Sequence, residues 1–427
     1  MTATSMPPRT LVQKILARAS GRADVAPGEI IWAEPDLVTM PELSYPAYVK
    51  RLADVGITRL ARPERVVVAV DHETPVHSIA GAERIRLTRK HAREQGIGHL
   101  FDAEGITHPL VVERGLVHPG MFVAGADTHT PGLGGIGALA IPFGMEVAMA
   151  MATGRIWLKV PRTLRVRVEG TLAAGVGARD IVLQAMRLIG EDEASDCVVE
   201  YCGEVIAGLS VPERMTICGL SVDMGADAGL IAADATSLRY LEQAGVSGVS
   251  ALAGDPMAPV QGEYLIHAAA LAPQVSVPPS PTHVRCVDEL SGVAIQHAYI
   301  GSCASGNMPE LRAAAQVLRG RTVHPDVQLL VIPATRRIHE QAMAEGVLGE
   351  LMAAGARIAA STCGPCFGGL AQLAPGEVRI STSTRNDPGR MGSSEAQIYL
   401  ASAATVAASA LAGRIADPRP LMQEGGR

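Results

Sequence analysis

Three cysteines in the second half of the sequence have a spacing that suits a metal centre. Cys363 and Cys366 stand in the tetrapeptide Cys-Gly-Pro-Cys, and Cys303 ends the run Ile-Gly-Ser-Cys upstream. Iron–sulfur clusters are held by cysteine thiolates. Three thiols are the minimum that holds a cuboidal cluster while leaving one iron without a protein ligand, so this set is a candidate iron–sulfur site.

The tetrapeptide alone leaves other chemistry open. The same four residues form the redox dithiol of thioredoxin-like proteins, where they begin a helix behind a tryptophan. Here Ser361-Thr362 precede them, and Gly368-Gly369 weaken a helix start. Structural zinc generally takes four ligands, and the sequence has no second C-x-x-C.

Two Asp/His pairs follow predicted strands. The branched run at 65–70 is typical of a strand buried on both faces and ends in Asp71-His72, and the run at 121–125 precedes Asp127 and His129. Open α/β sheets bind ligands at the carboxyl ends of their strands, and a carboxylate fixes the tautomer of a nearby imidazole. A strand-end turn with a satisfied histidine explains Asp71-His72 equally well. Elsewhere, His108 beside an apolar run is usually structural, and we interpret Glu42 as a solvated turn residue.

A glycine-rich loop follows His129. It contains Gly132, Gly134, Gly135 and Gly137, and the sequence predicts an apolar helix over 138–152. A helix N-terminus offers backbone N–H groups to an anion, so we expect a substrate carboxylate there. The spacing is not G-x-G-x-x-G, which excludes a dinucleotide fingerprint.

The elements predicted around the cysteines place them together. Strands at 298–303, 328–333 and 356–360, with a helix at 335–354, form a β-α-β order in which the outer strands deliver the thiols. Parallel strands with right-handed crossovers share one carboxyl edge, so we expect the three thiols at the same edge. Upstream, the alternation at 164–170 indicates an exposed or edge strand near a domain change, and the proline-rich stretch 273–281 predicts a linker.

Composition indicates an intracellular protein with two or three cores. Of 427 residues, 48% are hydrophobic, which suffices for several domains. A net charge of −6 and 3% aromatic residues argue against nucleic-acid binding. Seven cysteines, an odd number, without a secretory leader predict a reducing, cytoplasmic location. The uncharged run at 396–413 is rich in Ala, Ser and Thr, so we expect a buried helix and no membrane span.

Several ordered segments together resemble the aconitase superfamily. They are the residues 71–72, 125–130, 300–303, 363–369, 375–383, 385–386 and 388–393. The resemblance covers residues 10–418 and is closest to the large, catalytic subunit of isopropylmalate isomerase and homoaconitase. It implies an α/β fold of three α/β/α domains with mainly parallel sheets around a central iron–sulfur cleft. The expected domains are 1–162, 163–283 and 284–427, the last carrying the cysteines.

The resemblance also implies roles for individual residues. Cys303, Cys363 and Cys366 would ligate one 4Fe-4S cluster with one open iron, a Lewis acid for the substrate hydroxyl. Substrate binding would fall to Thr128, Arg385 and Arg390, since guanidinium groups grip carboxylates. The catalytic acid–base residues would be Asp71, His72, His108, Asp127, His129 and Asp223. In this family a serine on a swivelling domain takes the carbon-bound proton, and we expect a separate small subunit to supply it.

The chain departs from the family pattern around the substrate. The differences are Pro41, Thr128, Gly219, Asp223, Ser305, Thr384 and Asp387. One interpretation is drift with the ordinary interconversion of 2- and 3-isopropylmalate. Another is a changed substrate of the homoaconitate, 2,3-dimethylmalate, citramalate or maleate type, because lost amides alter recognition. A non-catalytic cluster carrier would not require the retained arginines and Asp/His groups.

Overall fold

The computed structural model describes residues 7–423, within which the strands form four sheets. The first large sheet is parallel, with the order β4-β3-β2-β5-β6. Every residue of β3 is buried, as its branched sequence predicts. Its strands are β2 (Leu37–Pro41), β3 (Val66–Val70), β4 (His99–Asp102), β5 (Phe122–Gly125) and β6 (Leu139–Pro142). In the same part of the chain are α1 (Leu11–Ser20), α2 (Tyr45–Asp54), η1 (Pro63–Arg65), α3 (Ile79–Gln95), α4 (Thr107–Glu113), η2 (Thr130–Ile136), α5 (Val147–Thr153) and the antiparallel ribbon of β1 (Ile30–Ala33) and β7 (Ile156–Lys159).

The second sheet is parallel, with the order β10-β9-β8-β11. The strand predicted at 164–170 is present as β8. Of the two predicted possibilities, an exposed strand is right for one face, and an edge strand is wrong, since β8 pairs on both sides. Its alternation arises because Val166 and Val168 face a helix-covered core while Arg167 and Glu169 face outward. The strands are β8 (Arg162–Glu169), β9 (Cys197–Cys202), β10 (Ala228–Leu230) and β11 (Gly262–His267). The helices and turns are α6 (Ala178–Ile189), α7 (Glu191–Ala194), α8 (Glu204–Gly208), α9 (Val211–Leu220), η3 (Ser221–Met224), α10 (Ala235–Gln243) and η4 (Ala268–Ala270).

The third sheet has seven strands in the order β13-β12-β18-β17-β14-β15-β16. Only the pairs made by β12 are antiparallel. The strands are β12 (Gln274–Ser276), β13 (Val284–Cys286), β14 (His297–Ile300), β15 (Gln328–Val331), β16 (Arg357–Ile358), β17 (Val378–Ser381) and β18 (Gln397–Leu400). The helices and turns are η5 (Val287–Leu290), α11 (Met308–Leu318), α12 (Arg336–Ala344), α13 (Val347–Ala353), η6 (Gly364–Phe367), α14 (Ala403–Ala412) and α15 (Arg419–Gln423).

Two predictions around this sheet need correction. The stretch 273–281 is not simply a linker, because β12 within it is buried and pairs with β13 and β18. The helix expected over 335–354 is divided into α12 and α13 at Gly346, whose φ of +77° breaks the helical path. The adjacency of β14, β15 and β16 confirms the predicted parallel order that brings the cysteine segments together.

The glycine-rich loop packs against protein rather than opening toward an anion. Residues 139–142 form β6, so the helix predicted over 138–152 is wrong and only α5 remains of it. A Cβ on Gly134 would lie 2.0 Å from the Gly229 carbonyl oxygen, and one on Gly135 would lie 2.4 Å from the Met215 nitrogen. The glycines therefore allow close contact with β10 and α9. The structure therefore gives no support to the prediction that this loop binds a substrate carboxylate at a helix N-terminus.

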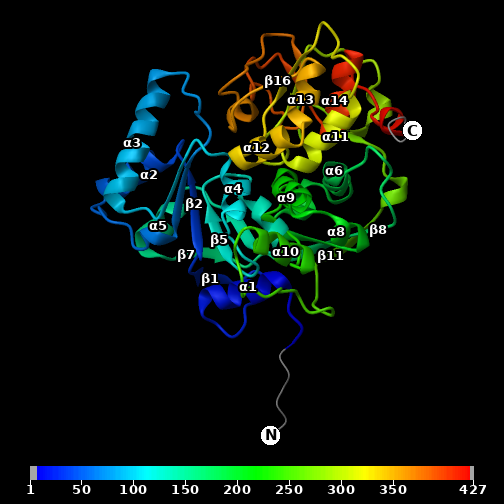
Figure 1. The fold of residues 1–427 in the computed structure, drawn as a ribbon. Coiled ribbons are helices and arrows are strands. Elements are labelled where there is room, and N and C mark those ends of the chain that lie inside the picture. Colours follow the sequence, from blue (N-terminus) through cyan, green and yellow to red (C-terminus); the bar gives the residue numbers. More distant parts are fainter. Residues whose placement is uncertain (1–6, 424–427) are drawn as a thin grey trace.

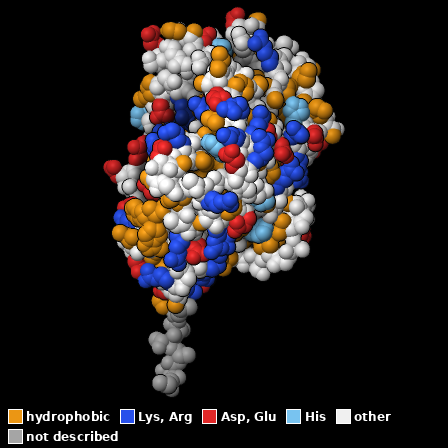
Figure 2. Space-filling view, turned by 90° about the vertical axis from the view of Figure 1, so that its left-hand side faces the viewer, with side chains coloured by type: hydrophobic (Ala, Val, Ile, Leu, Met, Phe, Trp, Pro, Cys, Tyr) orange, Lys and Arg blue, Asp and Glu red, His pale blue; other side chains and the backbone are white. Residues whose placement is uncertain are grey.

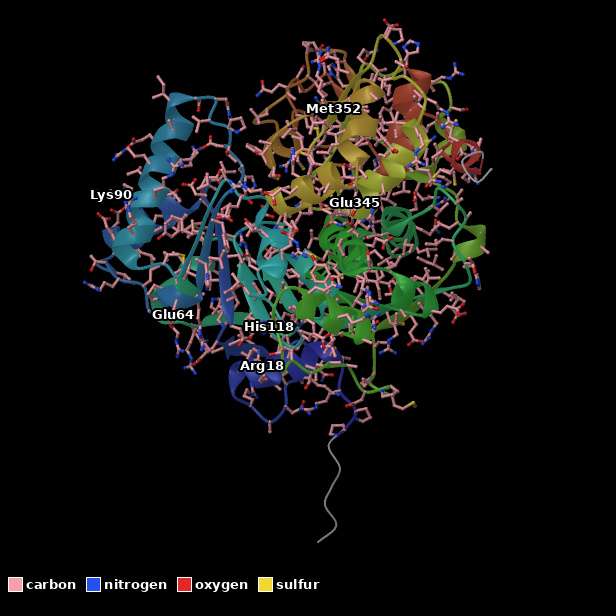
Figure 3. All side chains as sticks on the ribbon, viewed as in Figure 1. Arg18, Glu64, Lys90, His118, Glu345 and Met352 are labelled. Carbon is pink, nitrogen blue, oxygen red and sulfur yellow. The ribbon has the colours of Figure 1, made fainter. Side chains whose placement is uncertain are left out.

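Three mainly parallel sheets with helices confirm the predicted α/β class. Figure 1 shows the first sheet in blue to cyan, the second in green and the third, with its helices, in yellow to red above them. Basic and acidic side chains intermix on the face drawn in Figure 2. Exposed charged side chains such as Lys90 on α3 point away from the core in Figure 3. The proposed domain boundaries at 162/163 and 283/284 stay predictions.

The apolar run at 396–413 is buried in the third core. Its first part forms β18 and its second part forms α14, so the predicted buried helix occupies only the second part. Across residues 7–423 the structure contains no helix long and apolar enough to span a membrane.

The first and third sheets are joined through α4 and the start of α12. The Thr335 hydroxyl donates to Glu113 Oε1 at 2.9 Å, and the Ile106 amide donates to the Ala334 carbonyl at 2.9 Å. Glu113 is buried in this contact, and burial raises its carboxyl pKa to about 7. The carboxyl is therefore more easily charged in the unfolded chain than in the folded one.

Replacing this carboxyl tests the contact. The stabilisation linked to a raised carboxyl pKa is fully present below the unfolded value and is lost as pH rises through the folded value. Glu113→Gln does not titrate. The free energy of unfolding of this variant should therefore rise relative to that of the wild type between pH 5 and pH 8, by up to about 3 kcal/mol. Urea denaturation at both pH values measures this. Exposed Glu340→Gln on α12 is the control, and an equal difference at both pH values for Glu113→Gln would contradict the raised pKa of the buried Glu113 carboxyl.

Candidate active site

Asp71, at the end of β3, bonds to groups from three parts of the chain. Its Oδ2 accepts from the Thr107 amide at 2.8 Å and hydroxyl at 2.6 Å, and its Oδ1 accepts from His72 Nδ1 at 2.7 Å. Its backbone carbonyl accepts from the Cys363 amide at 2.8 Å and the Thr362 hydroxyl at 2.9 Å. The end of the first sheet is thus bonded directly to the cysteine segment of the third.

Glu42 holds the backbone of this strand end. Its carboxylate accepts the amides of Asp71, His72 and Glu73 at 3.2, 2.9 and 2.6 Å. Its side chain is fully buried, and burial, together with the charge of Asp71, raises its pKa to about 7. The interpretation as a solvated turn residue is wrong. Glu42 follows β2, the parallel neighbour of β3, and that position at a shared carboxyl edge was the available signal.

Asp127 lies between two histidines. It follows the end of β5, the strand that pairs with β2 on the side away from β3. Its Oδ1 accepts from His108 Nε2 at 2.9 Å and from the His129 amide at 2.8 Å, and its Oδ2 lies 3.5 Å from His72 Nε2. Burial opposes a charged imidazole, yet the carboxylates of Asp71 and Asp127 raise the pKa of His72 above its ordinary value. Burial likewise opposes charge on Asp127, while His108 and His72 hold its pKa well below the usual range. His72, Asp127 and His108 therefore form a row of alternating imidazoles and a carboxylate that can hold and transfer a proton.

The second sheet contributes Asp223 from η3. Its Oδ2 lies 3.2 Å from His129 Nε2, and its Oδ1 lies 3.6 Å from Arg385 Nη1. Burial opposes a charged His129 ring, but the Asp223 carboxylate raises its pKa. Thr128, between Asp127 and His129, is exposed. The structure therefore brings the predicted acid–base residues and Arg385 into one connected group.

The three thiols lie at the predicted edge of the third sheet. Cys363 precedes the turn η6 and Cys366 lies within it, and the Cys366 thiol lies 3.5 Å from the Thr384 hydroxyl. Cys303 follows β14, and the preceding Ser302 has a φ of +80° while its hydroxyl donates to the Thr382 carbonyl at 2.9 Å. A hydrogen bond from Cys363 holds the pKa of the Cys366 thiol well below its ordinary value, and Arg390 contributes to this.

Near this edge, buried polar atoms of two residues make no hydrogen bond within the described chain. Both side-chain polar atoms of Asn386, a residue only 1% exposed, lack a hydrogen-bond partner, as does Asp223 Oδ1. Soft thiolates favour iron–sulfur clusters, and orphaned polar atoms beside them suit a bound group. The residues present therefore fit an iron–sulfur cluster.

A closed single-ion site fits the thiols less well. Sulfurs around one tetrahedral zinc lie about 3.8 Å apart. Within the described chain, the three thiols do not lie within 4.8 Å of one another. Among its His, Cys, Asp and Glu side chains, the group of three whose ligand atoms do lie that close is Glu42, Asp71 and His72. Those three side chains already bond to one another and to backbone amides. We interpret them as a hydrogen-bonded cluster rather than a metal site.

Arg179 on α6 is a further residue at this edge that sequence analysis did not identify. It is 1% exposed, and its Nη1 donates to the Ser383 carbonyl at 2.9 Å while its Nη2 donates to the Thr382 carbonyl. The Thr382 carbonyl also accepts from Ser302, so one arginine ties α6 to the segments that carry Cys303 and Arg385. These partners lie about two hundred positions away, and no local pattern indicates them.

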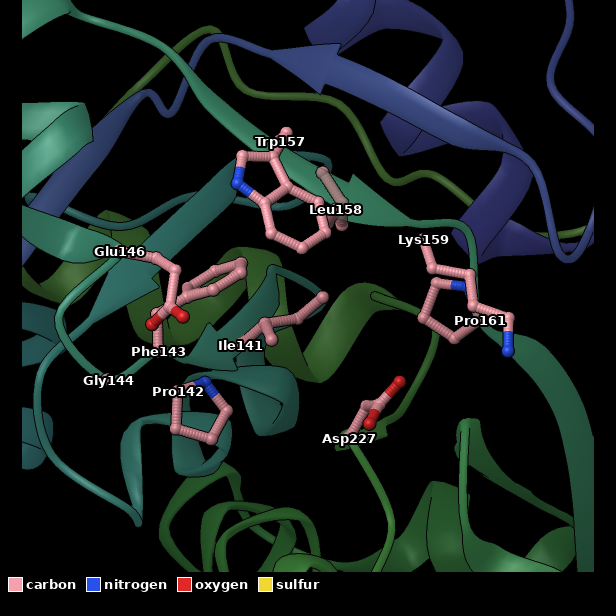
Figure 4. A pocket seen from close by; sticks show the side chains of 10 residues that line it. All are labelled: Ile141, Pro142, Phe143, Gly144, Glu146, Trp157, Leu158, Lys159, Pro161 and Asp227. Atoms are coloured by element: carbon pink, nitrogen blue, oxygen red, sulfur yellow. The ribbon is translucent and has the colours of Figure 1, made fainter.

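A cavity of about 300 Å³ lies elsewhere, between β6, β7 and β10. Figure 4 shows its lining, in which Trp157, Phe143 and Ile141 surround an opening with Glu146 and Asp227. No cysteine or histidine lines it, so it does not compete with the thiol edge as the place for the predicted chemistry.

Comparison with known proteins places the chain. A model of the aconitase family (aconitate hydratase) matches residues 13–292 and 287–413. The chain belongs to the aconitase family. This confirms the resemblance seen in the sequence and the predicted hydro-lyase class, and it implies an iron–sulfur cluster.

Curated relatives cover almost the whole chain. A 3-isopropylmalate dehydratase large subunit 1 from Methanopyrus kandleri is 42% identical over 97% of this chain and 100% of its own length. A 3-isopropylmalate dehydratase large subunit from Moorella thermoacetica is 40% identical over 97% of this chain and 99% of its own. One from Nitratidesulfovibrio vulgaris strain Miyazaki F is 41% identical over 96% of this chain and 99% of its own.

The role of Glu42 can be tested by removing its carboxylate. Glu42→Ala leaves three buried amides without an acceptor, and each such group costs about 1–3 kcal/mol. We expect the free energy of unfolding to fall by about 3 kcal/mol or more. Denaturant midpoints measure the loss, and exposed Glu94→Ala on α3 should leave the midpoint unchanged. Equal midpoints for the two variants would rule out the bracing role.

Proposed function

We propose that the chain is the large, catalytic subunit of a hydro-lyase that interconverts 2- and 3-isopropylmalate. The names of relatives at about 40% identity over nearly the whole chain support this substrate. The observation that carries the proposal is the contact of Asp71 with both His72 and the Cys363 segment. This contact joins a candidate acid–base group to the segment that carries Cys363, an arrangement that a hydro-lyase needs and a cluster carrier does not.

We propose that Cys303, Cys363 and Cys366 ligate a 4Fe-4S cluster with one iron open. When bound, the cluster supplies a Lewis acid for the substrate hydroxyl. All seven cysteines are unpaired, which suits the reducing cytoplasm that we propose as the enzyme's location.

The chain's own residues handle the leaving hydroxyl and the carboxylates. We assign protonation of the hydroxyl to the row formed by Asp71, His72, Asp127 and His108. His72 Nε2 lies 3.5 Å from Asp127 Oδ2, and His108 Nδ1 makes no hydrogen bond within the described chain, so we assign proton donation to these two rings. His129 and Asp223 form a second carboxylate–imidazole pair, and we assign carboxylate binding to Arg385, Arg390 and Thr128.

A separate small subunit completes the proposed enzyme. The relatives are named large subunits, which supports such a partner. In our proposal the small subunit carries the serine that removes the carbon-bound proton. This chain supplies the cluster ligands, the carboxylate-binding arginines and the acid for the hydroxyl.

Turnover by the assembled enzyme tests this function. The chain is produced without oxygen together with its small subunit, and its iron and sulfide contents are verified. It is then assayed with a panel that contains 2-isopropylmalate, 2,3-dimethylmalate, citramalate, malate and homocitrate. We expect reversible dehydration of 2-isopropylmalate; preference for another malate would revise the substrate. Absence of turnover with every 2-hydroxy acid and a full cluster would refute the enzyme proposal.

The ligand assignment makes a separate prediction. Cys363→Ser should abolish the brown absorbance of the reconstituted chain and lower its bound iron and sulfide, because a neutral hydroxyl replaces a thiolate ligand. Cys286→Ser, a half-buried cysteine on β13, is the matched control and should retain both. Unchanged iron content in Cys363→Ser would contradict the assignment.

A further inference from the structure

Arg385, proposed above to bind a substrate carboxylate, is already held by an internal carboxylate. Its Nε donates to Asp387 Oδ2 at 2.9 Å and its Nη2 donates to Asp387 Oδ1 at 3.2 Å, which is a bidentate arrangement. Its remaining nitrogen, Nη1, lies 3.6 Å from Asp223 Oδ1. Every nitrogen of this guanidinium therefore faces a carboxylate oxygen of the protein.

The two acids differ in how easily they can be displaced. The Asp223 side chain is fully buried and also contacts His129. The Asp387 side chain is 42% exposed, so water or a ligand can reach it. The Asp387 backbone carbonyl accepts the Arg390 amide at 3.0 Å, so the turn between the two arginines does not depend on the Asp387 carboxylate. Asp387 can release Arg385 while the loop keeps its path.

The neighbouring arginine presents a contrast. Arg390 donates through Nε to the Cys366 carbonyl at 3.2 Å, and within residues 7–423 its guanidinium has no carboxylate within 4.0 Å. Arg390 is thus open to an incoming carboxylate, whereas Arg385 is already paired with Asp387 of its own loop.

We infer that Asp387 is a specificity-determining residue whose carboxylate competes with a substrate carboxylate for Arg385. This inference rests on the proposed function. A first carboxylate of a 2-hydroxy dicarboxylate binds at Arg390, and a second binds at Arg385 only by displacing Asp387. The exchange of one bidentate carboxylate for another conserves charge pairing, so it favours ligands whose second group is itself a planar carboxylate.

Steady-state kinetics of the two-subunit, cluster-loaded enzyme test the competition. Asp387→Asn keeps the size of the side chain and removes its charge. KM for 2-isopropylmalate should fall about two- to fivefold, the range expected for a partly exposed ion pair, while kcat changes by less than about twofold. Asp387→Ala, which cannot accept from Arg385, should give the same direction. An unchanged or higher KM in both variants would overturn the inference.

A matched control exists in the same chain. Asp417 pairs with Arg419 at the same two-residue spacing, with Arg419 Nε at 2.8 Å from Asp417 Oδ2, beside α15 rather than the thiols. Asp417→Asn removes an equivalent local ion pair and should leave both KM and kcat unchanged. A fall in KM with this variant equal to that of Asp387→Asn would show a general charge effect and overturn the inference.

A readout without turnover separates this inference from the proposed substrate. Phenylglyoxal modifies arginine, and peptide mass analysis of the full chain measures its reaction with Arg385. Asp387→Asn should speed modification of Arg385 severalfold, and malonate, a simple dicarboxylate, should slow it. If no malate is turned over, the proposed function fails while this measurement still decides the competition. Equal modification rates in wild type and variant would overturn it.

Discussion

The bond between the Asp71 carbonyl and the Cys363 amide is the contact on which the rest of the site depends. It joins the end of a buried strand in the first sheet to the cysteine segment of the third. The Asp71 carboxylate also holds the His72 ring. The Glu42 carboxylate accepts three backbone amides of this strand end and so fixes the backbone around Asp71. Acid–base groups and thiols thus have one common anchor, and a shift of either sheet would move the imidazole relative to the proposed cluster.

Around that anchor, buried charges are arranged in opposite pairs. Asp71 and Asp127 flank His72, Asp127 also holds His108, and Asp223 holds His129. Burial opposes the charged forms of His72 and Asp127, and the opposite charges around them raise the pKa of His72 and lower that of Asp127. Arg179 is different, since it donates to backbone carbonyls and braces the segments before Arg385 and Cys303. The site is therefore built from mutually dependent contacts rather than separate residues.

The sequence was sufficient to predict those features that depend on local residue patterns. The branched run of β3, the Asp/His pairs after strands, and the β14-β15-β16 order with its cysteines follow from local patterns and parallel-sheet geometry. It failed where distant contacts decide. Only pairing on both sides makes β8 internal, and close approach to α9, not anion binding, explains Gly135. Glu42, Arg179 and the guarding of Arg385 by Asp387 depend on side-chain directions in the folded chain, which residue types and spacing do not specify.

We propose above that three cysteines hold a four-iron cluster with one iron free of protein ligands. Mild oxidation of the anaerobically reconstituted chain, with iron counted per chain and the product followed by electron paramagnetic resonance, tests it most directly. We expect loss of one iron in four, a paramagnetic three-iron cluster, and recovery of the fourth iron when ferrous iron and a reductant are added. Retention of all four irons, or a single metal ion per chain, would contradict it.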